Sequence, residues 1–179
     1  MAGSVSWNTK GWDKLLKRCN EMKDLVAKVG IQGDKAAAKH GDGGNLTNAE
    51  IAAVHEFSGP ADKPPGRPFI RPIYDNDPAK WQGEIAKACS EVVAGKSAQG
   101  ELRKLGEEYR KEVIARMKAG IAPPLAESTI NRRKGQNTQA KPDKIEAKQA
   151  AGKGHGLDVT PLIDTGTLLA AISVQVAKK

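Results

Sequence analysis

Aromatic side chains are scarce in this chain of 179 residues: three Trp, two Tyr and two Phe make up 4% of it. Aromatic rings supply much of the buried area of ordinary cores. Their scarcity, together with 19 glycines, predicts a lean core, long loops and stability drawn partly from neighbouring subunits. The length suits one domain of ordinary size, and we expect residues 1–179 to form a single domain.

Several classes of protein are not expected because their features are missing. No run approaches the roughly 18 consecutive apolar residues of a membrane span, and the first residues lack the basic and apolar regions of a signal peptide. The two cysteines, Cys19 and Cys89, lie far apart in the sequence, each on the apolar face of an expected helix. We therefore predict reduced cysteines in the core of a cytoplasmic fold rather than a disulfide.

The sequence also lacks the motifs of an enzyme or a cofactor site. His55-Glu56 is not followed by the second histidine of a zinc protease, because position 59 is Gly59. Gly95-Lys96-Ser97 lacks the earlier glycine and the preceding strand of a phosphate-binding loop. We therefore predict a protein that is not an enzyme, with no catalytic residue, cofactor or metal.

Positive charge is in excess, with 29 Lys and Arg against 21 Asp and Glu, a net charge of +8. Residues 131–156 contribute seven basic and two acidic side chains, and Ile145 is their one large apolar residue. Such a segment cannot bury enough apolar surface to offset the entropy lost on ordering, so we predict a basic mobile loop or arm inserted in the domain. Its candidate contact residues are Arg132, Arg133, Lys134, Lys141 and Lys144.

Apolar residues recur at steps of three and four along several stretches, the spacing of one face of a helix. Thr47 and Glu50 fit a capping box before one of these stretches. Asp77-Pro78 supplies a helix cap and a proline suited to the first helical position. The expected helices span residues 12–26, 48–57, 78–94, 99–118 and 126–133, with a further short helix near 166–169.

Two short stretches are predicted to be strands. Val29-Gly30-Ile31 is apolar and ends in turn residues, and residues 172–176 alternate apolar and polar side chains with a period of two. The glycine-rich residues 33–45 predict a loop, and the prolines of residues 63–72 predict an extended segment. The fold class is therefore α+β: a small antiparallel sheet packed against two long and several short helices, with a long basic loop insertion.

Three separated blocks, in this order, resemble a family of tailed-bacteriophage virion proteins, the tail-completion and head–tail joining proteins. The first block is Ala52-Ala53-Val54-His55-Glu56-Phe57, and the second is Gly66-Arg67-Pro68-Phe69-Ile70-Arg71-Pro72. The third pairs residues 123–130, which begin Pro-Pro-Leu, with residues 162–173, which contain Asp-Thr-Gly. Two departures from the family pattern are Ser58, which lengthens the turn after Phe57, and the insertion at 131–156.

The resemblance implies a structural virion protein, found in the neck or tail end and in the host cytoplasm during assembly. Such a subunit assembles with copies of itself into a ring, expected to be a hexamer, and joins the tail to the head connector. Its other implied partners are the phage head-connector or adaptor protein and the tail-tube or tail-terminator protein. No membrane partner is expected, and non-specific contact with phage DNA is a further expectation.

The residues that we expect at the interface with a subunit or partner are Glu56, Phe57, Arg67, Pro68, Phe69, Ile70 and Arg71. In one interpretation the arginines pair with carboxylates of an adjacent subunit and Phe69 fills a pocket there. In the other, Phe69 and Ile70 cover the core of their own domain. The alternative function is a basic nucleic-acid-binding accessory protein that acts through the 131–156 arm.

Overall fold

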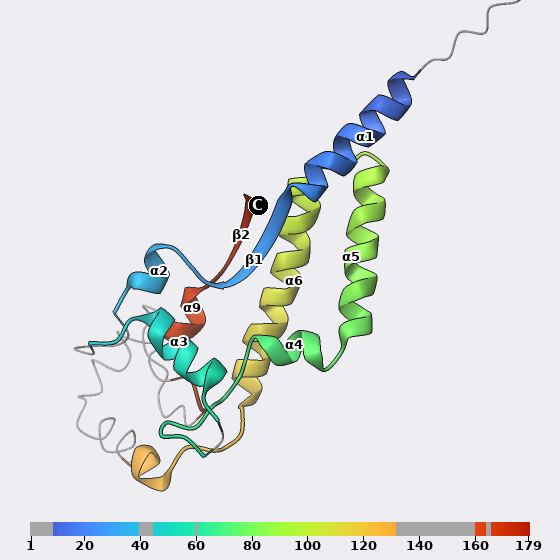
Figure 1. The fold of residues 1–179 in the computed structure, drawn as a ribbon. Helices are drawn as coiled ribbons and strands as arrows, with labels where there is room; N and C mark the ends of the chain where they lie inside the picture. Colours follow the sequence, from blue (N-terminus) through green and yellow to red (C-terminus); the bar gives the residue numbers. More distant parts are fainter. Residues whose placement is uncertain (1–8, 40–44, 60, 132–159, 164–165) are drawn as a thin grey trace, which may run out of the picture. The chain divides into compact units, whose positions relative to one another are not determined.

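A computed structural model of the chain describes residues 9–39, 45–59, 61–131, 160–163 and 166–179 (Figure 1). Most of the predicted basic arm, including Arg132, Arg133, Lys134, Lys141 and Lys144, lies outside these residues. Residues 127–131 are helical, within the short helix predicted there. The other elements are α1 (Lys10–Lys23), β1 (Leu25–Ile31), α2 (Asp34–Ala37), α3 (Asn48–Phe57), α4 (Arg71–Asp75), α5 (Pro78–Val93), α6 (Ala98–Ala119), α9 (Thr167–Ala171) and β2 (Ile172–Lys178).

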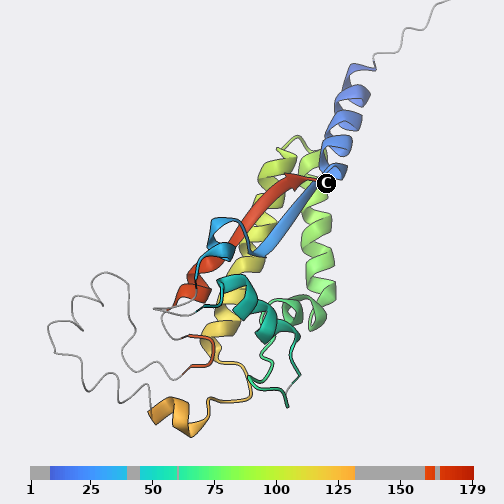
Figure 2. The same ribbon diagram turned by 60° about the vertical axis from the view of Figure 1, so that its left-hand side comes forward.

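The predicted α+β class is confirmed, because β1 and β2 form a two-stranded antiparallel sheet beside several helices. Figures 1 and 2 both show the two strands side by side. The prediction that the first helix continues through Leu25 and Val26 is wrong, because α1 ends at Lys23 and both residues belong to β1. The apolar spacing continues past the end of the helix, but strand pairing with β2 decides the backbone conformation there.

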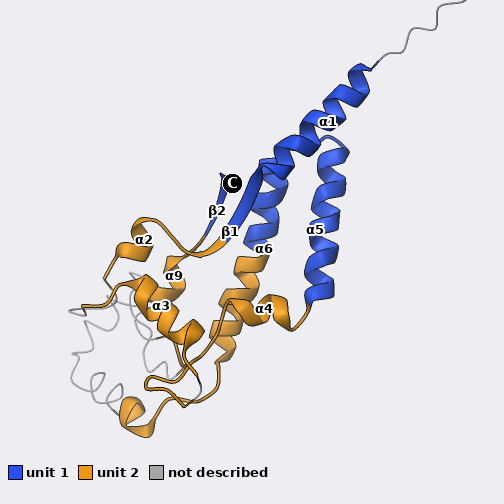
Figure 3. Cartoon of the chain, in the orientation of Figure 1, with its two compact units in different colours: residues 1–28, 78–108, 174–179 blue, residues 29–77, 109–173 orange. Residues whose placement is uncertain are grey.

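The chain divides into two compact units, coloured separately in Figure 3. Unit 1 comprises residues 1–28, 78–108 and 174–179, and unit 2 comprises residues 29–77 and 109–173. In unit 1, α1 contacts α5, and Arg18 Nη1 donates a hydrogen bond to the carbonyl oxygen of Val93 at 3.4 Å.

The buried face of α5 is narrower than its apolar stripe. Trp81, Ala88 and Val92 are buried, whereas Ile85 and Cys89 are exposed on one flank of that face. Cys19 on α1 is exposed too. The prediction that the two cysteines lie in the core is therefore wrong, because helical spacing marks an apolar face without saying how much of it a neighbour covers.

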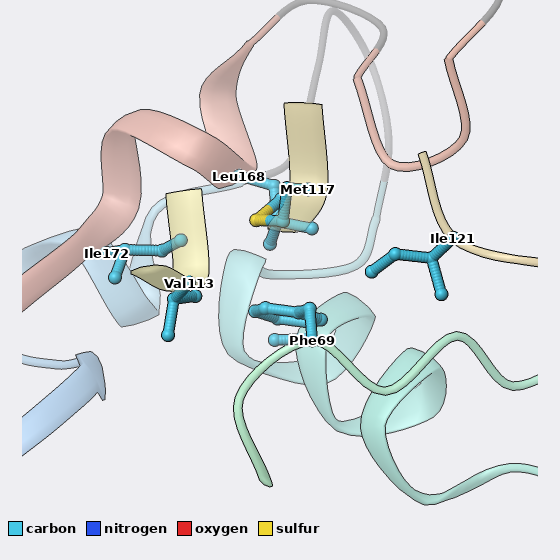
Figure 4. Packing of buried hydrophobic residues seen from close by; sticks show 7 residues of the cluster. Phe69, Val113, Met117, Ile121, Leu168 and Ile172 are labelled. Atoms are coloured by element: carbon cyan, nitrogen blue, oxygen red, sulfur yellow. The ribbon is translucent and has the colours of Figure 1, made fainter. Parts of the chain in front are cut away.

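The core of unit 2 joins residues from loops, three helices and a strand (Figure 4). Phe69, from the loop before α4, packs with Val113 and Met117 of α6, Leu168 of α9 and Ile172 of β2, and all five side chains are fully buried. Ala52 of α3 and Ile121 complete the cluster.

Local signals placed α3 and the start of α5 correctly. The Thr47 hydroxyl accepts from the Glu50 amide at 3.3 Å, and the Glu50 carboxylate accepts from the Thr47 amide at 2.7 Å, so the capping box is confirmed. α5 begins at Pro78, as predicted. The sequence missed α2, inside the expected loop, and α4, which begins within the last two residues of the expected extended segment. In α4 a proline lies in the first turn, where its missing amide hydrogen costs nothing.

Candidate interaction surface

Glu56, near the end of α3, binds the loop of residues 66–72, which we call the arginine–proline loop. One carboxylate oxygen accepts from the backbone amides of Phe69 at 2.8 Å and Ile70 at 3.0 Å, and the other accepts from the Arg71 amide at 2.8 Å. Hydrogen bonds to a charged acceptor are stronger than neutral ones. Glu56 therefore fixes the loop against the C-terminal end of α3 within its own chain.

The start of the loop lies directly on the chain that follows α3. The Gly66 amide donates to the Gly59 carbonyl at 2.8 Å, and the Arg67 amide donates to the His55 carbonyl at 2.7 Å. A Cβ atom at position 66 would lie only 1.8 Å from the Ser58 carbonyl oxygen. The close approach of two backbones thus requires glycine at position 66.

Arg67 is buried in unit 2, with 5% of its surface exposed. Its Nε donates to the Pro123 carbonyl at 2.8 Å, and its Nη2 donates to the Pro124 carbonyl at 3.1 Å. Burial lowers the pKa of its guanidinium group. Because these contacts lie within the chain, Arg67 is not available to a carboxylate of an adjacent subunit, and that expectation is corrected.

The middle of the loop also faces inward. Phe69 is fully buried, so of the two interpretations left open, it fills the core of its own unit and not a pocket of a neighbour. The Pro68 carbonyl accepts from Arg116 Nε at 3.3 Å, and the Ile70 carbonyl accepts from the Tyr109 hydroxyl at 3.0 Å. Partial burial is the main cause that raises the pKa of Tyr109.

Phe57 and Arg71 remain on the surface. Phe57 is the last residue of α3 and is 71% exposed. The guanidinium carbon of Arg71, which is exposed as well, lies 5.4 Å from the centre of the Phe57 ring, a cation–π contact. Of the interface residues predicted from the sequence, Phe57 and Arg71 are the two that are exposed to solvent, one with an aromatic ring and the other with a positive charge.

Beside this pair lies an open hollow of about 410 Å³, entirely within unit 2, which we call the α3 hollow. Alanines of α3 form much of its wall, because their small side chains leave space beside the helix. Sequence reasoning missed Ile31, Ala49 and Ala53 here; the available signal was the run of alanines at helical spacing before Phe57. The hollow is lined by Ile31, Ala49, Ala52, Ala53, Glu56, Phe57, Ile70 and Arg71.

The lining suits binding of an apolar side chain. Its one carboxylate, Glu56, already accepts three amide hydrogens, and its one cation, Arg71, stacks on Phe57. In the described part of the chain, no group of three or more His, Cys, Asp or Glu side chains is placed to hold a metal ion.

The described helices include none with the length and hydropathy needed to cross a membrane. Comparisons with protein-family models, with curated proteins and with solved structures find no match.

Proposed function

We propose that this protein is a structural subunit of a tailed-bacteriophage particle, which forms a ring with copies of itself at the neck or tail end and joins the tail to the head connector. The observation that carries the proposal is the convergence in unit 2 of the three sequence blocks that resemble the tail-completion family. Glu56 of the first block binds three amides of the second. Arg67 of the second binds two carbonyls of the third, and Phe69 packs on its Leu168.

These contacts hold the three blocks together within the fold. Two of them use a side chain to hold backbone groups, a carboxylate on amides and a guanidinium on carbonyls, and the third packs an aromatic ring in the core. The blocks thus behave as one scaffold motif, in which substitution at one block would disturb the other two. This favours a shared fold with the family over three chance similarities.

The surfaces left on this scaffold favour assembly. Phe57 and the α3 hollow expose apolar area next to the charge of Arg71, the combination of apolar centre and arginine that is typical of protein interfaces. Among the described residues, β1 pairs only with β2, so each strand has one edge without a strand partner. A lean subunit with such surfaces gains stability when neighbours cover them.

The direct test is the size of the purified full-length protein, measured by sedimentation alone and with the connector and tail-tube proteins of the same phage. We expect a ring, and we expect the protein in electron micrographs of mature particles at the head–tail junction. A protein that stays monomeric with all these partners and is absent from particles would contradict the proposal.

Exposed residues give the matching functional test. Phe57→Ala should leave a folded, soluble chain but yield unjoined heads and tails, because it removes an interface ring without touching the core. Ile85→Ala, which truncates an apolar side chain 44% exposed on α5, is the control and should give normal particles. Equal particle yields from both variants would count against an interface at Phe57.

A second candidate function is non-specific binding of nucleic acid through residues 131–156, favoured by their seven basic and two acidic side chains. Neutralised phosphates release counterions, so such binding weakens steeply as salt rises. Deletion of residues 136–155 should abolish a salt-dependent DNA mobility shift. An unchanged shift after the deletion would exclude this function for the arm.

A further inference from the structure

Helix α1 carries an apolar stripe that is largely exposed, with Leu15 as its half-buried member. Trp12, Leu15, Leu16 and Cys19 share one helical face by their spacing, and we call them the α1 stripe. Trp12 is 62% exposed, Leu16 is 44% exposed, and no residue of α1 is buried. Figures 1 and 2 show the first turns of α1 extending past the end of α5, the helix that it contacts.

The α3 hollow is a matching surface on unit 2. Its volume of about 410 Å³ falls in the range of pockets that accept whole ligands, roughly 300–1,000 Å³. An indole ring with part of a leucine side chain fits a space of this size. The rim already holds an exposed aromatic ring, Phe57, against which a second ring can pack edge to face.

The charges of the two helices are complementary. α1 carries five basic and two acidic side chains, whereas α3 carries two glutamates and no Lys or Arg. Beside Trp12 stands the acidic Asp13, and the cation of the hollow is Arg71. Opposite charges around an apolar contact favour encounter and fix its register. Pairing of two α1 helices would instead bring two basic helices together and leave the hollow open.

We infer that α1 of one copy inserts its stripe into the α3 hollow of the next copy. A protruding element on one surface and a hollow on another make a heterologous interface, which closes into a ring when the rotation between copies permits. This inference rests on the proposed ring assembly, for which it names the contacting surfaces. It makes Trp12 the central anchor, the residue type most enriched among the residues that dominate binding energy.

The test uses two full-length variants, each damaging one side of the contact. Trp12→Glu places a charge on the stripe, and Ala53→Glu fills the hollow from an exposed position of α3. Each alone should be a folded monomer, with self-association weakened at least about 30-fold, the loss expected for an anchor residue. Ile85→Glu, an equally drastic change at an exposed site of α5, should assemble like the wild type.

Mixing the two variants in equal amounts supplies the decisive measurement by light scattering. The intact hollow of Trp12→Glu and the intact stripe of Ala53→Glu still fit, so the mixture should form dimers and nothing larger. Circular dichroism of each variant checks that the chain remains folded.

Each contrary outcome has a distinct meaning. Rings formed by Trp12→Glu would overturn this inference while leaving the proposed ring assembly in place. A monomeric Trp12→Glu with an assembling Ala53→Glu, or a mixture without dimers, would refute the contact between stripe and hollow. A wild type that remains monomeric even with its phage partners would overturn both proposals.

Discussion

Replacing Glu56 tests whether one carboxylate holds the arginine–proline loop on α3. Glu56→Ala removes the acceptor of three amides, at 2.8, 3.0 and 2.8 Å. A hydrogen bond to a charged group contributes about 1.5–3 kcal/mol when its partner is left without a replacement. The site is only partly buried, so water replaces part of the loss, and we expect Glu56→Ala to lower the free energy of unfolding by about 3 kcal/mol.

The stability of the neutral isostere, Glu56→Gln, should lie between those of the wild type and Glu56→Ala. In Glu56→Gln one amide oxygen still accepts from the loop, but the amide NH₂ group faces a donor, so we expect a loss of about 1–2 kcal/mol. For a chain of this length, about 3 kcal/mol corresponds to a Tm lower by roughly 6–12 °C.

The assay combines thermal unfolding with hydrogen exchange of the peptide that covers the loop. The amides of Phe69, Ile70 and Arg71 should exchange faster in Glu56→Ala, because they lose their acceptor. Glu127→Gln, at an exposed glutamate of the helical residues 127–131, is the control and should be silent. Unfolding and exchange unchanged from wild type in Glu56→Ala would refute the assigned role.

Further predictions concern substitutions at four positions. Gly66→Ala should destabilise the protein by at least about 2 kcal/mol, since the added Cβ would lie 1.8 Å from the Ser58 carbonyl oxygen. Gly83→Ala on α5, where a Cβ would have nothing within 4 Å, should instead stabilise it by about 0.5–1 kcal/mol. Equal effects of the two substitutions in urea titrations would contradict both predictions. Phe69→Ala should cost about 3–5 kcal/mol in the same titration because the ring is fully buried, and a loss below 1 kcal/mol would place the ring outside the core. The hydrogen bonds from the N-cap residue Thr47 lower the pKa of Glu50 below its ordinary value of 4.5. The stabilisation from Glu50 is therefore complete above pH 4.5 and is lost as the pH falls through the lower pKa of the folded state. The stability difference between wild type and Glu50→Gln should vanish in acid, and a difference that persists at pH 2 would exclude this linkage.

Signals carried by neighbouring residues predicted local structure well. The capping box placed α3, and the sequence Asp77-Pro78 placed the start of α5, because both depend on contacts within one turn. The antiparallel pairing of the first and last strands was also predicted. The end of α1 was not, because Leu25 and Val26 continue its apolar spacing but are held in β1 by a strand distant in sequence.

The candidate site divides in the same way. The interface set named from sequence contains the surface pair Phe57 and Arg71, but it also contains Arg67 and Phe69, which face inward. A sequence motif shows that a residue type is required at a position without showing which side of the chain it faces. Ala52 and Ala53 belong to the first block, and Ile31 and Ala49 also line the α3 hollow, but nothing in the sequence showed that these side chains enclose a hollow. A hollow depends on the space that neighbouring side chains leave empty.

By itself the sequence determined the longer helices and the approximate positions of the two strands, but not α2, α4 or the end of α1. It also determined the positive charge of residues 131–156 and the order of the blocks that resemble the phage family, because periodicity, capping and composition act over a few residues. The tertiary structure alone decided that Arg67 and Phe69 serve the interior, that Glu56 holds the loop, and that Trp12 stands uncovered. Those outcomes depend on which surfaces meet across long stretches of chain, and burial is a relation between residues rather than a property of one.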